Sequence, residues 1–173
     1  MTCRSGTTPA SPPFPAPSQI KPAMRLTESP LMPEFKHVLR WPVQWGDQDA
    51  YQHVNNTIYF RWFETGRMTY SADIGLDRNR LESEGLGVIL PAISCQFRAA
   101  LFHPDVVHIG TSVTRFGRSS MTMLHRIYSE KFQKVVADGE STVVVFQYRE
   151  QVAVPIPEFV RTAIEALEGR SLS

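Results

Sequence analysis

The sequence contains little cysteine, no long hydrophobic run and no block of charge of one sign. Its two cysteines, Cys3 and Cys95, lie in a Pro-rich segment and a strand-like segment, respectively. Two thiols so placed are a poor disulfide framework, so we expect a reducing compartment and a cytoplasmic protein. No apolar stretch approaches the roughly 18 residues of a membrane span. The net charge of +1, without charge blocks, argues against nucleic acid or a membrane surface as a partner.

Motifs of several other enzyme classes are also absent from the sequence. There is no Gly-x-Ser-x-Gly nucleophile elbow, no Walker loop and no dinucleotide fingerprint. The histidines share no metal-ligand spacing with cysteines or carboxylates, so we expect no metal and no cofactor. Cys95 alternates with apolar Ile93 and Phe97, which predicts a packed thiol rather than a nucleophile.

The first 33 residues differ in composition from the rest of the chain. They contain 8 of the 13 prolines and show neither helical nor strand periodicity. Such a segment buries too little apolar surface to offset the entropy of ordering it, so residues 1–33 are predicted to be a disordered tail. Its cations, with no acid before Glu28, leave a mitochondrial signal open, although the prolines disfavour the amphipathic helix of such a signal. Residues 34–173 suit a single domain.

A buried helix is the clearest element predicted in this domain. Asn55 or Asn56 is a suitable N-cap, and apolar and aromatic residues then recur at three- and four-residue spacing as far as Tyr70. These residues occupy much of the helix circumference, which predicts burial rather than a surface position. The helix is expected to end between Asp73 and Gly75, where glycine can form the C-cap.

Most of the remaining chain has the composition of β-strands. One strand is predicted before the helix, and β-branched and aromatic residues mark four more after it. Short turns between them favour antiparallel neighbours, and Pro157 then opens a short helix with one apolar face. A single sheet cannot keep its core face dry, so it should curl round the buried helix, giving an α+β domain. The strands are predicted at 36–45, 87–101, 106–116, 119–130 and 135–150.

A polar stretch, "VQWGDQDAYQHVNNTIYFRWFETGR" (43–67), leads into the predicted helix. It resembles the signature of the 4-hydroxybenzoyl-CoA thioesterase family and its acyl-CoA thioesterase relatives, in which Gly-Asp-x-Asp and often His-Val-Asn-Asn precede an aromatic helix with an acid. The resemblance covers about residues 36–168, including "PAISCQFRAALFHPDVVHI" and "RFGRSSM". It implies a hotdog fold, in which an antiparallel sheet wraps round a long central helix. It also implies hydrolysis of acyl-CoA to a free acid and CoA.

The resemblance implies roles for the residues of this motif. Asp49 matches the catalytic carboxylate, which attacks the thioester or activates a water molecule. The backbone amide of Asn56, at the positive end of the helix dipole, matches a donor to the developing oxyanion. Asp47 and Asn55 are expected to support the loop and the start of the helix.

Two further residues of the motif have open roles. His53 could contact the acyl carbonyl, orient Asp49 or move a proton, or it could be a loop histidine held by the backbone. Glu64 is the alternative catalytic carboxylate, because another branch of hotdog thioesterases takes its acid from this helix. Arg61 and Arg67, each three residues from Glu64, favour a helical ion pair instead.

A cationic turn is the candidate site for the phosphates of CoA. Arg115 and Arg118 can contact phosphates, Ser119 and Ser120 add hydroxyl donors, and Gly117 permits a tight turn. Relatives of the resembled family hold CoA near this hairpin. A solvated turn without a ligand is the alternative.

Two other functions stay open at this stage. A hotdog enoyl-CoA hydratase or dehydratase has four residues between its aspartate and histidine, whereas here three separate Asp49 from His53 and five separate Asp47 from His53. A non-catalytic acyl-thioester-binding protein would need no poised carboxylate.

Members of the family pair their sheets edge to edge, which implies a homodimer or tetramer with the site at the subunit interface. The substrate is expected to be acyl-CoA, with an acyl-carrier-protein thioester as the alternative.

Overall fold

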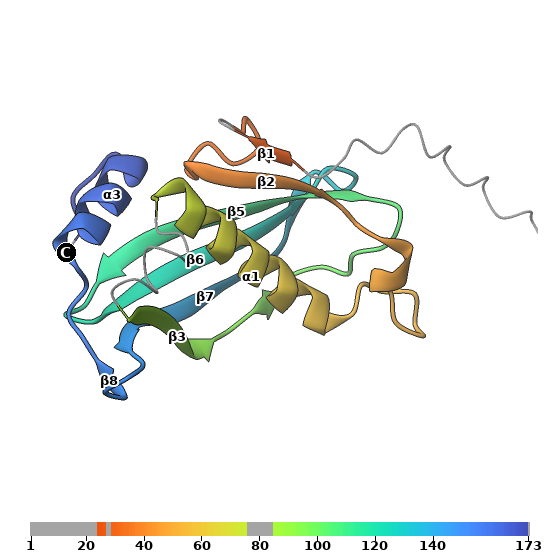
Figure 1. Cartoon of the computed structure of the whole chain (residues 1–173). Helices are drawn as coiled ribbons and strands as arrows, with labels where there is room; N and C mark the ends of the chain where they lie inside the picture. Colours follow the sequence, from red (N-terminus) through yellow and green to blue (C-terminus); the bar gives the residue numbers. More distant parts are fainter. Residues whose placement is uncertain (1–23, 27–28, 76–84, 173) are drawn as a thin grey trace, which may run out of the picture.

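The computed structural model describes residues 24–26, 29–75 and 85–172. In this part of the chain, one antiparallel sheet curls around a long helix, α1 (Asn56–Asp73) (Figure 1). The predicted α+β architecture, a sheet wrapped round a central helix, is therefore confirmed. The strands are β1 (Met24–Leu26), β2 (His37–Pro42), β3 (Leu86–Ile93), β4 (Gln96–Phe97), β5 (Val106–Phe116), β6 (Ser120–Ser129), β7 (Lys134–Gln147) and β8 (Val152–Ala153).

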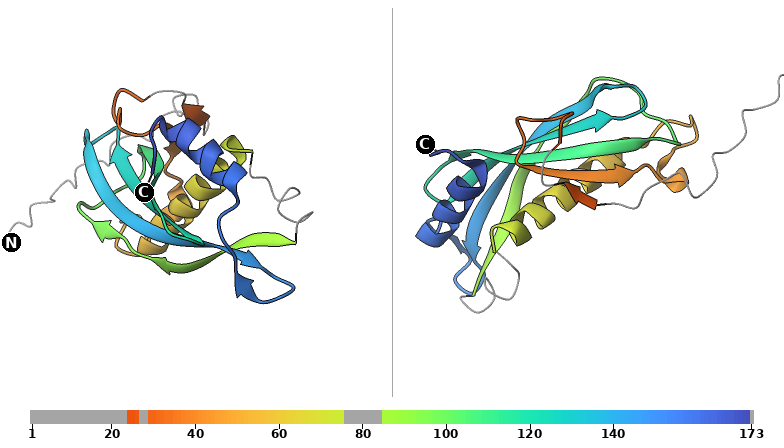
Figure 2. Two further views of the ribbon diagram at one scale, coloured as in Figure 1. Left: turned by 90° about the vertical axis from the view of Figure 1, so that its left-hand side faces the viewer. Right: turned by 90° about the horizontal axis from the view of Figure 1, so that it is seen from above.

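A second helix, α3 (Glu158–Glu168), lies near the C-terminal end of α1 (Figure 2). The Tyr70 hydroxyl of α1 donates a hydrogen bond to the carboxylate of Glu168 (2.7 Å), which also accepts from the backbone N–H of Val113 on β5 (2.8 Å). One carboxylate thus ties both helices to the sheet. The predicted C-terminal helix is confirmed, with Pro157 as its N-cap.

The order of the main strands across the sheet is β1-β2-β5-β6-β7-β3, and all the pairs are antiparallel. β5, β6 and β7 follow one another as the short turns predicted. We expected β3 to lie next to β5 as well, and that expectation is wrong. β3 pairs with β7, and the chain after β4 crosses the open end of the sheet, where the backbone N–H of Val54 donates to the carbonyl oxygen of Leu101 (2.8 Å).

The hollow of the sheet is filled by the aromatic face of α1. Tyr59, Trp62 and Phe63 are buried, and Phe63 stacks on the imidazole of His125 with ring centroids 4.7 Å apart. Burial lowers the pKa of His125 to about 3, so its ring is neutral at physiological pH. Its two nitrogens lie within hydrogen-bond distance of the Thr111 and Ser141 hydroxyls, at 3.3 and 2.8 Å. His125 is therefore a buried polar group that carries no charge.

The predicted disordered tail is wrong for the part of it that the structure describes. Residues 1–23 and 27–28 lie outside the described residues, but 24–26 form β1 on β2, and Met32 is 1% exposed. Met32 packs with Phe35 and Val38 in an apolar cluster beneath this segment. The few apolar residues among the prolines thus bury enough surface to hold residues 29–33 against the sheet.

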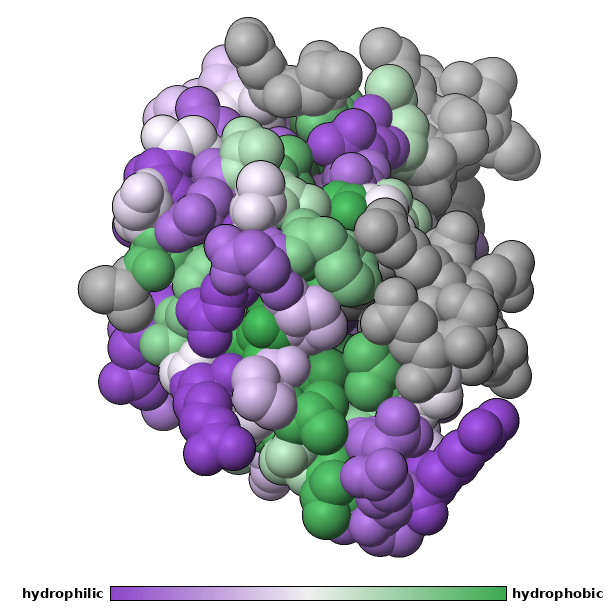
Figure 3. All heavy atoms as spheres, turned by 60° about the vertical axis from the view of Figure 1, so that its left-hand side comes forward, coloured by the Kyte–Doolittle hydropathy of each residue, from purple (hydrophilic) through white to green (hydrophobic). Residues whose placement is uncertain are grey.

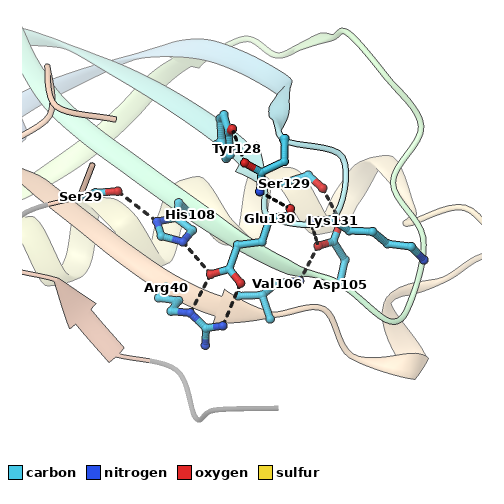
Figure 4. A network of polar contacts seen from close by, with 10 residues as sticks. Ser29, Arg40, Asp105, Val106, His108, Tyr128, Ser129, Glu130 and Lys131 are labelled. Carbon is cyan, nitrogen blue, oxygen red and sulfur yellow. Dashed lines mark hydrogen bonds and ion pairs between the residues drawn. The ribbon is translucent and has the colours of Figure 1, made fainter. Parts of the chain in front are cut away.

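A polar network also fixes this segment to the sheet (Figure 4). The Ser29 hydroxyl and the His108 Nδ1 atom are 3.2 Å apart, and His108 Nε2 lies 2.8 Å from the Glu130 carboxylate. Arg40 donates two hydrogen bonds to the same carboxylate, at 2.7 and 3.0 Å. These cationic and donor groups hold the pKa of Glu130 below its ordinary value, against the opposing effect of burial.

Two predicted strands are shorter than expected. The strand predicted at 36–45 ends at Pro42 and is followed by a 3₁₀ turn, η2 (Trp45–Asp47). The strand predicted at 87–101 is interrupted between β3 and β4, although both pieces pair with β7 and the Ser94 N–H between them still bonds to Glu140 of β7. Within the described ranges, no helix is both long and apolar enough to cross a bilayer.

The close contact between Ser94 and β7 requires a glycine at position 139. A Cβ atom at Gly139 would lie 2.1 Å from the Ser94 carbonyl oxygen and 3.0 Å from the Phe63 ring. The Ser94 backbone is also held by a hydrogen bond from its N–H to the Glu140 carbonyl oxygen (2.8 Å), so it has little freedom to retreat. The glycine therefore sets the position of the segment that follows Ser94.

We expect Gly139→Ala to lower the free energy of unfolding by about 1–3 kcal/mol, because the added methyl group overpacks a rigid backbone contact. Gly46→Ala is the matched control, since a Cβ atom there meets nothing within 4 Å. The control should change stability by less than about 0.5 kcal/mol. Urea denaturation of both variants measures the difference in their free energies of unfolding. Equal denaturation midpoints for the two variants would show that the contact between Gly139 and Ser94 is not tight.

Candidate active site

A cavity of about 400 Å³ opens at the N-terminal end of α1. Three of the predicted catalytic residues, Asp49, His53 and Asn56, line it. They come from the loop between β2 and α1 and from the first residue of the helix. The opposite wall is the segment that crosses the end of the sheet, Phe97 to Leu101, and the remaining lining residues are Val54 and Tyr59.

The loop is fixed by Asp47, which does not line the cavity. Its carboxylate accepts a hydrogen bond from the Gln44 N–H (2.7 Å), and its backbone carbonyl accepts from the Asn55 N–H (2.8 Å). These two contacts connect the end of β2 to the start of α1. Asp47 therefore makes the kind of contacts that the expected supporting role requires.

Asp49 is oriented by its own turn. Its backbone N–H donates to the His53 carbonyl oxygen (2.8 Å), and its Oδ1 atom accepts from the Tyr51 N–H (2.8 Å). This Asx turn holds one carboxylate oxygen in place. Among the described residues, the other oxygen has no hydrogen-bond partner, so the carboxylate presents a free acceptor at the cavity.

The start of α1 leaves one backbone donor unpaired. Asn55 is the N-cap, and its side-chain oxygen accepts from the Thr57 N–H (2.9 Å), while its own N–H is bonded to Asp47. Of the three amides at residues 55–57, only that of Asn56 has no partner within the described part of the chain. An unpaired N–H at the positive end of a helix dipole can donate to a developing oxyanion.

His53 lies at the exposed side of the cavity. Its ring packs edge-on against Phe102 at a centroid distance of 5.0 Å, and its backbone carbonyl accepts from Asp49. No hydrogen bond joins its imidazole to Asp49 in the described residues. The contact with Asp49 is thus made by the backbone of His53.

Sequence reasoning missed one charged residue of this cavity, Arg98. Its guanidinium forms a two-pronged ion pair with Asp138 of β7, which holds the pKa of that carboxyl below its usual range. Arg98 lies in a segment with the composition of a strand, and nothing in its local pattern indicated a cavity wall. Arg98 lies near Asp49 because the chain after β4 crosses the open end of the sheet, and the sequence did not predict that path.

Tyr59, which lines this cavity, is buried, and Cys95 of the same apolar cluster is partly buried. Burial raises the pKa of the Tyr59 phenol to about 12, so it stays protonated at neutral pH. Burial likewise raises the pKa of the Cys95 thiol to about 11. The thiol is therefore protonated at neutral pH, which agrees with the predicted packed cysteine.

Glu64 does not lie in this cavity. It lines a second cavity further along α1, together with Arg67. We expected an ion pair with Arg61 or Arg67, but in the described residues neither guanidinium is within 4.0 Å of the Glu64 carboxylate. Within one chain, Glu64 is thus separated from Asp49.

The four predicted CoA-binding residues lie at the other end of the sheet. β5 begins near the cavity and runs for 11 residues to the hairpin, a span of roughly 30 Å. The side chains of Arg115 and Arg118 are exposed, and the Arg118 carbonyl is contacted by Arg161 of α3. One chain does not bring this hairpin to the Asp49 cavity. The residues concerned are Arg115, Arg118, Ser119 and Ser120.

Comparison with known proteins gives a family and several similar structures. The family model of the Thioesterase-like superfamily matches residues 43–164. The PA5185 protein of Pseudomonas aeruginosa is 29% identical, with 80% of this chain and 94% of that chain covered at a TM-score of 0.69. A thioesterase from Thermus thermophilus complexed with coenzyme A and Zn is 27% identical, with 80% and 98% covered and a TM-score of 0.69. The BH1999 gentisyl-coenzyme A thioesterase is 27% identical, with 73% and 98% covered and a TM-score of 0.65.

The raised pKa of Cys95 predicts slow alkylation. In a Cys3→Ser variant Cys95 is the sole thiol. With a pKa of about 11, roughly one thiol in a thousand is ionised at pH 8. The rate with iodoacetamide should therefore rise about tenfold per pH unit from pH 7 to 10. It should also be roughly a hundredfold slower in the folded protein than in urea at pH 8, and equal rates would show that the thiol is exposed.

Proposed function

The chain belongs to the Thioesterase-like superfamily, and from that premise we propose that it hydrolyses acyl-CoA thioesters to a free carboxylate and CoA. One observation carries the proposal. A carboxylate oxygen of Asp49 and the N–H of Asn56, both without partners in the described residues, meet at one cavity. A carboxylate beside an unpaired backbone donor suits a carbonyl group that becomes an oxyanion.

In the proposed reaction, the thioester carbonyl oxygen accepts a hydrogen bond from the Asn56 N–H. That bond strengthens as the carbonyl carbon is attacked and negative charge gathers on the oxygen, which favours the transition state over the bound substrate. Asp49 either attacks the carbon itself or removes a proton from the attacking water. The C–S bond then breaks, and CoA leaves as a thiolate that takes up a proton. If Asp49 is the nucleophile, a water molecule next hydrolyses the anhydride between the acyl group and Asp49, which releases the acid and restores the carboxylate.

The other residues of the motif have supporting roles in this proposal. Asp47 and Asn55 consume two of the three amides at the start of α1, which leaves the third for the substrate. His53, exposed at the side of the cavity, is placed to exchange a proton with solvent or the leaving thiolate. Tyr59 stays protonated and can act only as a donor or as an apolar wall.

The proposed partner is a second copy of the chain. β3 is the last strand of the sheet, and its Val88 and Leu90 side chains are 39% and 41% exposed. Within the described residues, the outer edge of β3 has no neighbouring strand. A strand edge with exposed apolar residues is a surface that proteins usually cover. We infer that two copies pair through β3, as a homodimer or as half of a tetramer. The hairpin arginines would then reach a bound CoA only from another subunit.

Asp49→Asn tests the reaction directly. Asparagine keeps the oxygen that accepts from Tyr51 but removes the negative charge, so kcat should fall by about a hundred- to ten-thousandfold with the fold intact. Release of free thiol from acyl-CoA, with chain lengths varied, measures kcat. Glu64→Gln is the comparison and should lose far less. If Glu64→Gln alone abolished turnover, the catalytic carboxylate would be misassigned.

A retained rate in Asp49→Asn would overturn the proposed mechanism. Two further measurements on the wild type distinguish the two alternatives to hydrolysis. Binding of acyl-CoA by the wild type without thiol release would indicate a binding protein. Loss of the absorbance of an enoyl-CoA would indicate a hydratase.

A double variant, Arg115→Gln with Arg118→Gln, tests the proposed CoA site. We expect KM for acyl-CoA to rise about tenfold, because two charge-assisted contacts to phosphate are lost. KM for the matching acyl-pantetheine, which lacks the nucleotide phosphates, should stay unchanged. Arg98→Gln is the rival variant, since Arg98 lines the Asp49 cavity of the same chain. A selective rise in KM for Arg98→Gln alone would place the phosphates there instead.

A further inference from the structure

A second cavity, of about 200 Å³, lies between the C-terminal half of α1 and the sheet. Its walls are mainly apolar and include Val88, Ile89 and Leu90 of β3 and Met121 and Met123 of β6. Apolar side chains also reach the surface between polar ones on the face of the molecule that carries α3 (Figure 3). A cavity with such walls suits a hydrocarbon chain.

Two charged residues of α1, Glu64 and Arg67, also line this cavity. The Nη1 atom of Arg67 is buried and has no hydrogen-bond partner in the described residues. Burial lowers the pKa of Arg67, and the negative charge of Glu64 opposes that effect only in part. The Glu64 side chain is exposed and makes no ion pair with Arg67 in the described part of the chain. In the described part of the chain, the guanidinium is therefore a partly buried cation without a paired anion, an arrangement that costs free energy.

The helix places Arg67 in line with the proposed reaction centre. Arg67 follows Asn56 by eleven residues, which is about three turns, so both lie on the same face of α1. The rise between them is roughly 16 Å. Helical side chains lean toward the N-terminus, which shortens the distance from the guanidinium to the Asn56 end. Phe63, which is fully buried, fills the sheet side of this face between the two residues. An acyl chain held at Asn56 would therefore run along the outer side of the helix, past half-buried Phe60 and exposed Glu64, to bring its far end to Arg67.

We propose that this second cavity receives the far end of the acyl group and that Arg67 binds a carboxylate there. The inference rests on the proposed hydrolysis and names its substrate class, the mono-CoA thioesters of medium-chain dicarboxylic acids. The flat guanidinium fork can bind a carboxylate through two parallel hydrogen bonds. The apolar walls would pack against the methylene groups between the two carboxyl carbons.

The test compares matched substrates that differ only at the far end. Thiol release is measured with eight-, ten- and twelve-carbon acyl-CoAs and with their ω-carboxyl counterparts. In the wild type, kcat/KM should be about ten- to a hundredfold higher for the ω-carboxyl member at the best length. Arg67→Met keeps the apolar stem of the side chain without the guanidinium, and it should abolish this preference while hydrolysis of the uncharged acyl-CoA continues.

Three further variants make the test specific. Arg61→Gln removes an exposed cation of the same helix that does not line the cavity, and it should keep the wild-type preference. Glu64→Gln removes the negative charge near Arg67, so it should increase the preference for the ω-carboxyl substrate. Arg67→Lys keeps the charge without the fork and should retain part of the preference, which keeps the test valid if Arg67→Met folds poorly.

The outcomes separate failure of the inference from failure of the proposed function. Equal kcat/KM for both members of each pair in the wild type, or a preference that Arg67→Met leaves intact, would overturn the inference and leave hydrolysis standing. No thiol release from any substrate would overturn the proposed hydrolysis and the inference with it.

Discussion

The burial of α1 in the hollow of the sheet is the constraint on which the rest of the structure depends. The helix packs its aromatic face into the sheet while Arg61, Glu64 and Met68 stay exposed on the other face. One curled sheet cannot keep its inner face dry without such a helix. Phe63 shows how tight this packing is, since it is fully buried and stacks on His125 of the sheet. A polar group stacked beneath Phe63 must therefore be neutral and paired. His125, held between two hydroxyl groups with its pKa lowered by burial, meets that requirement.

The same burial determines where chemistry can occur. The backbone N–H groups in the middle of α1 are paired within the helix, so unpaired donors are available only at its first turn. The loop before the helix and the segment that crosses the sheet end meet there and form the walls of the cavity. Asp47 and Asn55 then occupy the amides on either side of Asn56. The catalytic proposal thus depends on the Asn56 N–H, which stays unpaired while the backbone carbonyl of Asp47 and the side chain of Asn55 take up the amides beside it.

Features that depend on neighbouring residues were predictable from the sequence. The N-cap at Asn55, the extent of α1 and the β5–β7 meander follow from capping, periodicity and short turns. The grouping of Asp49, His53 and Asn56 was predictable as well, because they are close in the sequence. Contacts between distant segments were not predictable. The pairing of β3 with β7 and the Arg98–Asp138 ion pair have no local signal. The cluster of Met32 and Phe35 was hidden by the prolines around it.

The two cavities along α1 allow the reaction and the choice of acyl group to be set by different residues. The reaction would use the first turn of the helix, whose geometry is fixed by the loop, while selection would use side chains three turns away. Those side chains line the second cavity together with β3, which is also the last strand of the sheet in the described part of the chain. Val88 and Leu90 therefore belong to the candidate acyl pocket and to the candidate subunit interface. Because one strand serves both, a change at either residue would alter substrate preference and assembly together, whereas a change at Arg67 would alter preference alone.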